Sequence, residues 1–267
     1  LDYGTSSGYR LTLARSLARS SNTNLELSYL GIDDLDSYSR VVDPGNLDSF
    51  LRAGVPNAEQ FRNAYSHTAY GKTRLHAFEV NTRRYCATRR GWMASALAGF
   101  RYMHIDDDFM FLSNDSDPAV NAEDIGLYAV GTENNLVGGQ IGGSLANQCT
   151  CKFSTGVKLK TGIFANFNEQ RGRFLNVPAP APATADLHSK HSSTSLSAVI
   201  ETGLFANYQF SRCVGLRAGY DVFIIDGLAL TANQLDYTAN QFQGQSFVND
   251  NSSLVFYGPT VGLWVNW

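Results

Sequence analysis

The sequence has no apolar run of about 18 residues, the length that a transmembrane helix requires. A helical membrane span is therefore not predicted. Charged residues make up 17% of the chain, against roughly 25% in an average soluble domain. The formal net charge of −3 leaves no basic excess that would indicate a nucleic-acid partner. No Cys-x-x-Cys-His motif is present, which argues against covalently attached haem.

The sequence also lacks an initiator methionine and a signal peptide at its start. Its first residues, LDYGTSSGYR, resemble the interior of a protein. We therefore expect a targeting segment, and more of the same domain, upstream of Leu1.

What the sequence does contain is long alternation of apolar and polar residues. From Trp92 to Tyr102 every second residue is alanine or aromatic, whereas the opposite face carries Ser95, Gly99 and Arg101. A period of two places successive side chains on opposite faces of a β-strand. The stretch exceeds the usual soluble strand of about 5–6 residues. It suits a transmembrane β-strand, which needs roughly 9–11 residues when tilted.

Nine stretches of this kind are predicted as strands. They are Gly8–Leu17, Asn24–Ile32, Lys72–Tyr85, Trp92–Ile105, Asn135–Ala146, Lys152–Phe167, Thr194–Phe210, Val214–Ile225 and Leu254–Trp267. Short turns join them in pairs, and long polar segments separate the pairs. One of these segments is acidic and runs from Asp106 to about Asn134, and another contains PAPAPAT from Pro178 to Thr184.

All short turns therefore fall at one end of the strands and all long loops at the other. Outer-membrane barrels have short periplasmic turns, longer extracellular loops and, in single bacterial chains, an even number of strands. The predicted fold is an all-β, antiparallel, transmembrane outer-membrane β-barrel. Residues 1–267 form its single domain, and one upstream strand would complete a barrel of about ten strands.

A soluble all-β sandwich is the alternative, because its sheets also alternate. The length of the strands argues against a sandwich. Aromatic residues near the strand ends also argue against it, because membrane barrels carry rings of aromatic residues at both membrane interfaces. These aromatic residues are Tyr9, Tyr29, Tyr102, Phe210, Trp264 and Trp267.

Several strings of the sequence occur together in one known family. They are FEVNTRRY followed by GWMASALAGFRYMHIDDDF, then ENNLVGGQIGGSL, LRAGYDVFIIDGLALTANQLD and LVFYGPTVGL. In this order, from Phe78 to Trp267, they resemble the planctomycete-type beta-barrel porin-7 family of outer-membrane proteins. The cysteine-bearing turns depart from that family's pattern. The resemblance implies a location in the bacterial cell outer membrane but brings no substrate.

If the apolar face meets lipid, the charged residues of the strands face the lumen. This predicted lining comprises Arg10, Glu26, Glu79, Arg83, Arg101, Lys158, Lys160, Glu201, Arg217 and Asp221. One interpretation is a selectivity lining. The favoured one is an ion-pair network that fills a narrow barrel, because about eight strands leave an interior just filled by side chains and open channels occur at roughly 16–18. Arg101 and Arg217 are the expected centre of this network.

Catalytic and metal sites are weighed against this. Of the five histidines, His76 and His104 share the phase of outward residues, whereas His67, His188 and His191 are placed in loops. No Ser-His-Asp set converges, so no enzyme is predicted. Oxygen ligands for Ca²⁺ could come from Asp106, Asp107 and Asp108 with Asp115 and Asp117, but the spacing does not match an EF-hand, and a solvated acidic loop is favoured. No cofactor and no metal is predicted.

The four cysteines, Cys86, Cys149, Cys151 and Cys213, all fall at short turns. An oxidising periplasm favours disulfides there, so cross-turn pairs are predicted, with the connectivity open.

Three functions remain. The first is an outer-membrane barrel with a structural or surface-interaction role and a largely plugged lumen, and the second is a narrow porin-like diffusion channel for ions or small solutes. The third, less favoured, is a soluble β-sandwich adhesin. The expected partners are outer-membrane lipid and, through the long loops, further copies of the chain or other envelope proteins.

Overall fold

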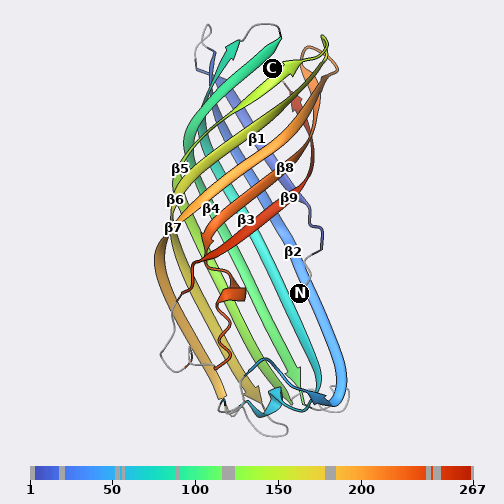
Figure 1. The fold of residues 1–267 in the computed structure, drawn as a ribbon, viewed down its shortest axis with the longest axis vertical. Coiled ribbons are helices and arrows are strands. Elements are labelled where there is room, and N and C mark those ends of the chain that lie inside the picture. Colours follow the sequence, from blue (N-terminus) through green and yellow to red (C-terminus); the bar gives the residue numbers. More distant parts are fainter. Residues whose placement is uncertain are drawn as a thin grey trace.

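The computed structural model describes residues 4–17, 22–51, 55, 58–87, 91–115, 124–177, 185–238, 242 and 248–265. Within these residues nine strands form one sheet, and each strand pairs antiparallel with its neighbours in sequence order (Figure 1). They are β1 Gly8–Ser16, β2 Thr23–Leu47, β3 Ala64–Ala87, β4 Trp92–Asn114, β5 Ile125–Gln148, β6 Phe153–Val177, β7 Ala185–Gln209, β8 Val214–Leu228 and β9 Ser252–Val265. Two short 3₁₀ turns, η1 Glu59–Phe61 and η2 Thr231–Asn233, accompany them. The predicted all-β antiparallel fold is confirmed.

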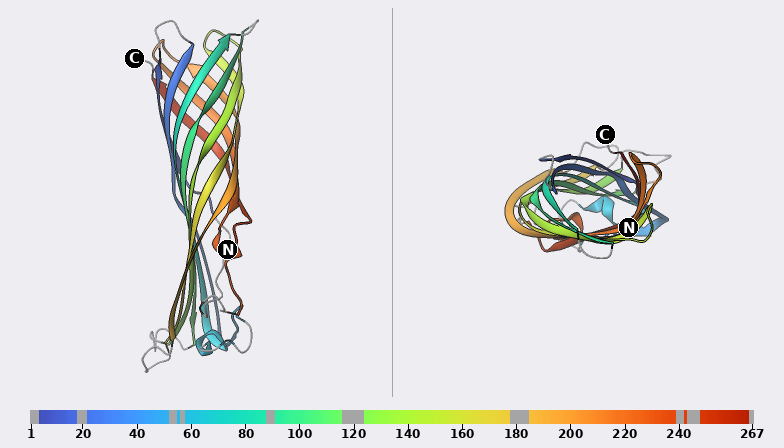
Figure 2. Two further views of the ribbon diagram at one scale, coloured as in Figure 1. Left: turned by 90° about the vertical axis from the view of Figure 1, so that its left-hand side faces the viewer. Right: turned by 90° about the horizontal axis from the view of Figure 1, so that it is seen from above.

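The sheet curls into a barrel at the end that carries the short turns. In the upper half of Figure 1 all nine strands wrap around, and the view along the axis in Figure 2 shows them enclosing a ring. Side chains from distant strands meet inside it, since Arg10 of β1 lies 2.7 Å from Glu201 of β7. In the described part of the chain β1 and β9 do not pair with each other, and the upstream strand expected beside them stays a prediction.

Six strands, β2 to β7, continue well beyond the barrel as an open twisted sheet. These strands are 23–25 residues long, so much of what the sequence predicted as long loops is sheet. The acidic-loop prediction for Asp106–Asp108 is wrong, because these residues lie within β4. His67, His188 and His191 likewise lie on β3 and β7 rather than in loops. The Pro178–Thr184 stretch, Asp117 and Trp267 lie outside the described residues.

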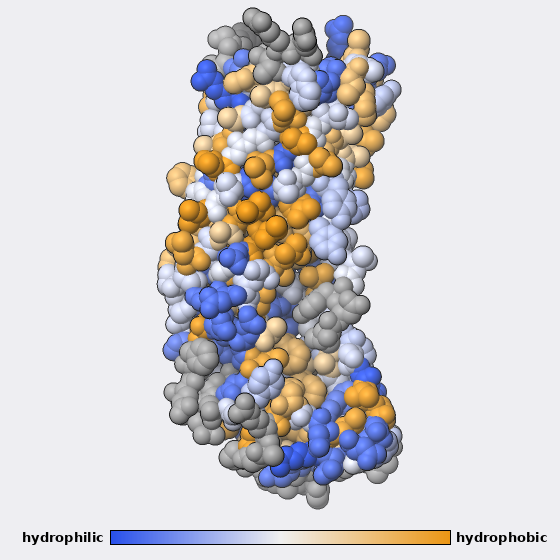
Figure 3. Space-filling model, viewed as in Figure 1, coloured by the Kyte–Doolittle hydropathy of each residue, from blue (hydrophilic) through white to orange (hydrophobic). Residues whose placement is uncertain are grey.

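The parts of β2 to β7 beyond the barrel, which we call the outer sheet, could not be predicted from alternation, because both faces of this sheet are polar in places. On β4 the convex face is apolar from Trp92 to Tyr102 and then carries His104, Asp106 and Asp108. A strand that leaves the hydrocarbon needs no apolar outer face, so the alternation that marks a membrane strand fades where the membrane ends. Figure 3 shows apolar side chains gathered over the middle and upper parts of one face and hydrophilic ones below them.

On the loop side of this apolar band, ion pairs line the convex face, most of them between neighbouring strands. We call this set the outer belt. Its pairs, given with their N–O distances, are His76–Asp33 at 3.2 Å, Arg74–Asp108 at 3.1 Å, His104–Asp106 at 3.2 Å, Arg171–Glu133 at 3.4 Å, Lys190–Glu169 at 3.0 Å and Arg173–Asp186 at 3.0 Å. Because most of these side chains are well exposed, each pair contributes little to stability, about 0–1 kcal/mol. We expect the wall to pass from lipid to water at the outer belt, because charged side chains are costly to expose to lipid.

The predicted disulfides are absent. All four cysteines, Cys86, Cys149, Cys151 and Cys213, are free and exposed. Successive short turns are two strands apart, and two interstrand spacings amount to roughly 9–10 Å. A disulfide needs Cα atoms within about 7 Å, so neighbouring turns are too far apart to be joined without moving the sheet.

Candidate functional site

The concave face of the barrel collects the charged side chains of the strands. Two-residue alternation puts all ten predicted lining residues on this face, and their apolar neighbours on the convex face. The concave set is Arg10, Glu26, Glu79, Arg83, Arg101, Lys158, Lys160, Glu201, Arg217 and Asp221. The convex set includes Leu11, Val80, Phe100, Val157, Ile200, Leu216 and Val261, of which Phe100 and Val261 are 74% and 77% exposed.

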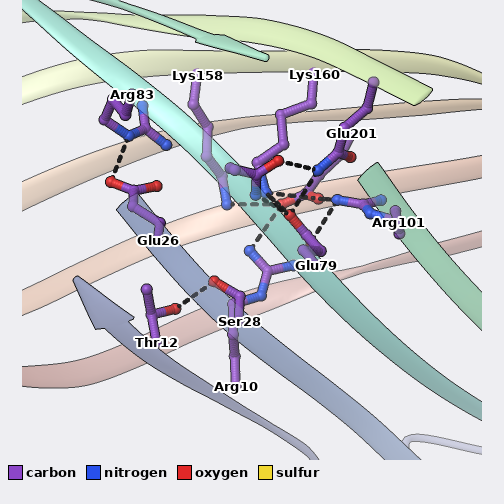
Figure 4. Close-up of polar contacts among 12 residues, drawn as sticks. Arg10, Thr12, Glu26, Ser28, Glu79, Arg83, Arg101, Lys158, Lys160 and Glu201 are labelled. Carbon is purple, nitrogen blue, oxygen red and sulfur yellow. Dashed lines mark hydrogen bonds and ion pairs between the residues drawn. The ribbon is translucent and has the colours of Figure 1, made fainter. Parts of the chain in front are cut away.

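Glu201 on β7 is the centre of a buried ion-pair network (Figure 4). Four cations meet its carboxylate, and each comes from a different position in the sheet. Arg10 and Arg101 donate to it at 2.7 and 2.8 Å. Lys158 and Lys160 of β6 lie 3.2 and 3.4 Å from it. A carboxylate that is 1% exposed could not stay charged without such partners, because removing an ion from water costs several kcal/mol.

A second carboxylate, Glu79 of β3, completes one side of the network. Arg101 bridges the two acids, since it also donates to Glu79 at 2.5 Å. Lys160 lies 3.0 Å from the other oxygen of Glu79. That oxygen also accepts hydrogen bonds from Asn81 and Gln140, both at 2.9 Å. Every oxygen of Glu79 therefore has a donor, as a buried carboxylate requires.

Asp221 of β8 closes the opposite side of the network. Lys158 donates to it at 2.7 Å, and Arg10 lies 3.9 Å away. A Cβ on Gly203 of the neighbouring strand would strike the Asp221 carboxylate and lie 3.1 Å from Lys158. Glycine at this position therefore leaves room for the pair. With four cations and three carboxylates, the network carries one excess positive charge.

A smaller polar group lies nearer the short turns. Glu26 accepts from Arg83 at 2.7 Å, and Arg83 also donates to Ser95 at 2.8 Å. The prediction that Arg217 stands at the network centre is wrong. The guanidinium carbon of Arg217 lies 3.9 Å from the centroid of the Phe205 ring, and no carboxylate of the described residues lies within 4.0 Å of it. Arg217 lies opposite Asn207, six residues of β7 closer to the short turns than Glu201.

An apolar layer fills the barrel directly beyond the network. It consists of buried concave side chains from six strands, β3 to β8. Arg101 contacts it by stacking 5.4 Å from the Phe223 ring centroid. Its members are Leu75, Ala77, Met103, Ile105, Leu136, Phe164, Val199, Phe223, Ile225 and Leu228. The sequence pattern does not predict this layer, because its apolar residues share a phase with the charged residues of their strands.

At the end of β8 the chain folds back across the concave face and covers the apolar layer. We call residues 227–234, which include the last two residues of β8, the strap. The backbone N and O of Ala229 bond to Asn134 at 2.9 and 2.8 Å. Asp107 accepts from the backbone N and the hydroxyl of Thr231 at 2.8 and 2.7 Å. The carbonyl of Gly227, whose φ of +82° favours glycine, accepts from Asn166 and Ser197.

Sequence reasoning missed the amides and the acid that hold these parts together. They are Asn81, Asp107, Asn134, Gln140 and Asn166, all of them buried. Each lies an even number of residues from a concave charge or apolar residue of its own strand, so the phase of the strand was the available signal. No group of three or more His, Cys, Asp or Glu side chains among the described residues is placed to hold a metal ion.

The comparisons with known proteins agree with this architecture. The family model of beta barrel porin-7 (BBP7) matches residues 64–263, from the start of β3 almost to the end of β9. No curated protein and no solved structure matches the chain. The match covers most of the sequence, and the strands it spans form the curled antiparallel sheet described above. The chain therefore belongs to the beta barrel porin-7 family.

Proposed function

We propose that this protein is an outer-membrane β-barrel whose lumen is occluded, and that its role is structural or in surface interaction rather than in catalysis. The observation that carries the proposal is the stacking of three layers on the concave face. These are the network centred on Glu201, the apolar layer and the strap. The family and the fold support the outer-membrane location.

The burial of the central charges supports occlusion. The side chains of Arg101 and Glu201 are each 1% exposed, although they reach into the middle of the barrel. Ions that cross a pore need a continuous path of water. The apolar side chains of Met103, Leu136 and Phe164 lie across such a path and are 0–1% exposed. A hydrophobic constriction of this kind excludes water and ions.

The outer sheet supports a role at the surface. β2 to β7 run on beyond the outer belt and carry the long loops away from the membrane. An aromatic core stabilises their outer end, where Phe61, Phe111, Tyr128 and Phe174 are buried. A pore does not require strands that extend this far beyond the barrel, whereas a protein that presents its loops to partners does.

A narrow porin-like channel is the competing function. It is favoured by partial exposure within the network, where the side chains of Arg10 and Asp221 are 29% and 20% exposed. Water therefore reaches the network. The two functions differ in whether water also passes the apolar layer.

Conductance in planar bilayers decides between them. The full chain is refolded and shown to insert by flotation with lipid vesicles. It is then expected to give no steady conductance steps in concentrated salt solutions. Steps that grow in proportion to salt, with an ion selectivity that changes in Arg101→Ala, would establish the channel and overturn the occluded barrel. Fractionation of envelopes tests the location separately.

A further inference from the structure

The cysteines of this chain are gathered at one end of the molecule. The sequence holds four, and all lie at short turns: Cys86 at the end of β3, Cys149 and Cys151 between β5 and β6, and Cys213 between β7 and β8. The turn-bearing end is the upper end in Figure 1. We call this set the thiol rim. Three of the four short turns thus carry a thiol, and the long loops carry none.

The thiol rim faces outward into solvent and has no partner within the chain. All four residues are exposed and free. Cys149 makes only weak contacts, at 3.6 Å to the Thr155 hydroxyl and 3.7 Å to the Asn147 carbonyl. Neighbouring turns are roughly 9–10 Å apart, so cross-turn pairing is blocked by the spacing of the strands. An exposed thiol in an oxidising compartment does not persist unpaired when a partner thiol is in reach.

A second copy of the chain is the partner that the geometry fits. Two barrels inserted in one membrane share the same orientation, since the long loops of both lie on the outer side. Their thiol rims then lie at the same depth, just beyond the apolar band that ends near Trp92. Barrels in lateral contact bring their rims edge to edge at this depth. No other part of the fold places cysteines where a neighbouring barrel could meet them.

We propose that the thiol rim links neighbouring copies of this protein by intermolecular disulfides, which joins the barrels into a covalent array. The inference rests on the proposed outer-membrane location. The three thiol-bearing turns point in different directions around the wall, so one barrel can be linked to more than one neighbour. A single attachment point would give dimers only.

The chemistry is thiol–disulfide exchange with a disulfide oxidant of the periplasm. The thiolate of one barrel attacks a sulfur of the oxidant, which forms a mixed disulfide and releases one oxidant thiol. The thiolate of the second barrel then attacks the barrel sulfur of the mixed disulfide and releases the second oxidant thiol. Two barrel thiols are oxidised, one oxidant disulfide is reduced to two thiols, and the two protons end on those thiols.

The experiment compares the full chain with cysteine variants in outer-membrane fractions. Cells are lysed in N-ethylmaleimide, and the fractions are run on denaturing gels with and without reductant. We expect wild-type bands at several multiples of the monomer mass, which collapse to monomer with reductant. The variant with all four cysteines changed to serine is expected to be monomeric. A variant that keeps only Cys213 is expected to stop at the dimer.

Identity is checked by producing two differently tagged copies in one cell. Capture of one tag under non-reducing conditions should recover the other from wild type and not from the four-serine variant. Monomers with all four thiols alkylated would overturn the proposal, as would a Cys149–Cys151 bond within one chain or a linked partner of different sequence. If these monomers fractionate with the outer membrane, the array alone fails. If the chain is absent from that fraction, the proposed location fails as well.

Discussion

Arg101 of β4 donates a hydrogen bond to Glu201 of β7 at 2.8 Å, although two further strands separate them in the sheet. In a flat sheet, strands three places apart lie roughly 14–15 Å apart, which is too far for this contact. The pair therefore exists because the sheet curls, and it also holds the curl in place. Its two side chains are the natural point at which to test what the interior contributes.

Replacing Glu201 by glutamine should destabilise the barrel strongly. The change leaves four cations around a neutral, buried amide, and breaking a buried ion pair from one side costs about 3–5 kcal/mol. Urea unfolding in lipid vesicles, followed by tryptophan fluorescence, measures the loss. Glu169→Gln is the matched control, because Glu169 pairs on the outer belt with the exposed side chains of Arg171 and Lys190. An equal loss in both variants would show that the central network adds nothing beyond a surface pair.

The apolar layer should respond to the loss of one ring. Phe164 is 1% exposed inside the barrel, and Phe167 on the same strand is 53% exposed toward lipid. Phe164→Ala leaves a cavity and is expected to cost about 3–5 kcal/mol in the free energy of unfolding. Phe167→Ala exchanges one lipid contact for another and should cost clearly less. If Phe167→Ala is the more damaging of the two, the assigned faces of β6 are reversed.

The strap should loosen when Asp107 is removed. Asp107→Ala removes the acceptor of the two hydrogen bonds that the backbone N–H and the hydroxyl of Thr231 donate, and leaves that N–H buried without an acceptor. We expect faster hydrogen–deuterium exchange across residues 227–234, with the exchange of β4 and β5 unchanged. Asp106→Ala is the control, because this neighbouring residue points to the convex face and pairs with His104. Unchanged exchange in Asp107→Ala would mean that packing alone holds the strap.

The height of the membrane is tested on the convex face of one strand. Phe100 lies in the apolar band, and Met110 lies two residues beyond Asp108, the last outer-belt residue of β4. Phe100→Arg is expected to cost about 2–4 kcal/mol, whereas Met110→Arg should cost about 0–1 kcal/mol, because the penalty for a lipid-facing arginine falls from the midplane to the interface. Urea unfolding in vesicles measures both. Similar costs at the two sites would place the membrane boundary elsewhere on β4.

The barrel portion could be predicted from the sequence because membrane strands obey a strict rule. Lipid requires an apolar convex face. The alternation from Trp92 to Tyr102 therefore predicts both the strand β4 and which of its residues face outward. All nine strands and the family resemblance followed from such stretches. The outer sheet could not be predicted in the same way. Residues such as Asp106 and Asp108 face water there, and their charges removed the apolar face on which strand prediction depends.

The interior shows a similar division. Alternation could place Arg101 and Glu201 on one face, but only the curl of the sheet decides which charges meet. Because the sheet curls, Arg10 of the first strand contacts Glu201, whereas Arg217 lies beside Phe205. The strap could not be predicted, because its backbone atoms bond to Asp107 and Asn134. Backbone hydrogen bonds of this kind do not affect the alternation of apolar and polar residues. The cysteine pairing failed because turn-to-turn distance is set by strand spacing.

The unbroken register of the long strands has a mechanical consequence. From β3 to β7 each neighbouring pair keeps one register from the loop end to the turn end, without a bulge. Ladder hydrogen bonds run across the strands, so a pull on the outer loops along the strand direction loads many of them in shear at the same time. Such a sheet does not unzip bond by bond. A pull on the long loops is therefore transmitted along the whole length of β3 to β7 without opening the sheet one bond at a time.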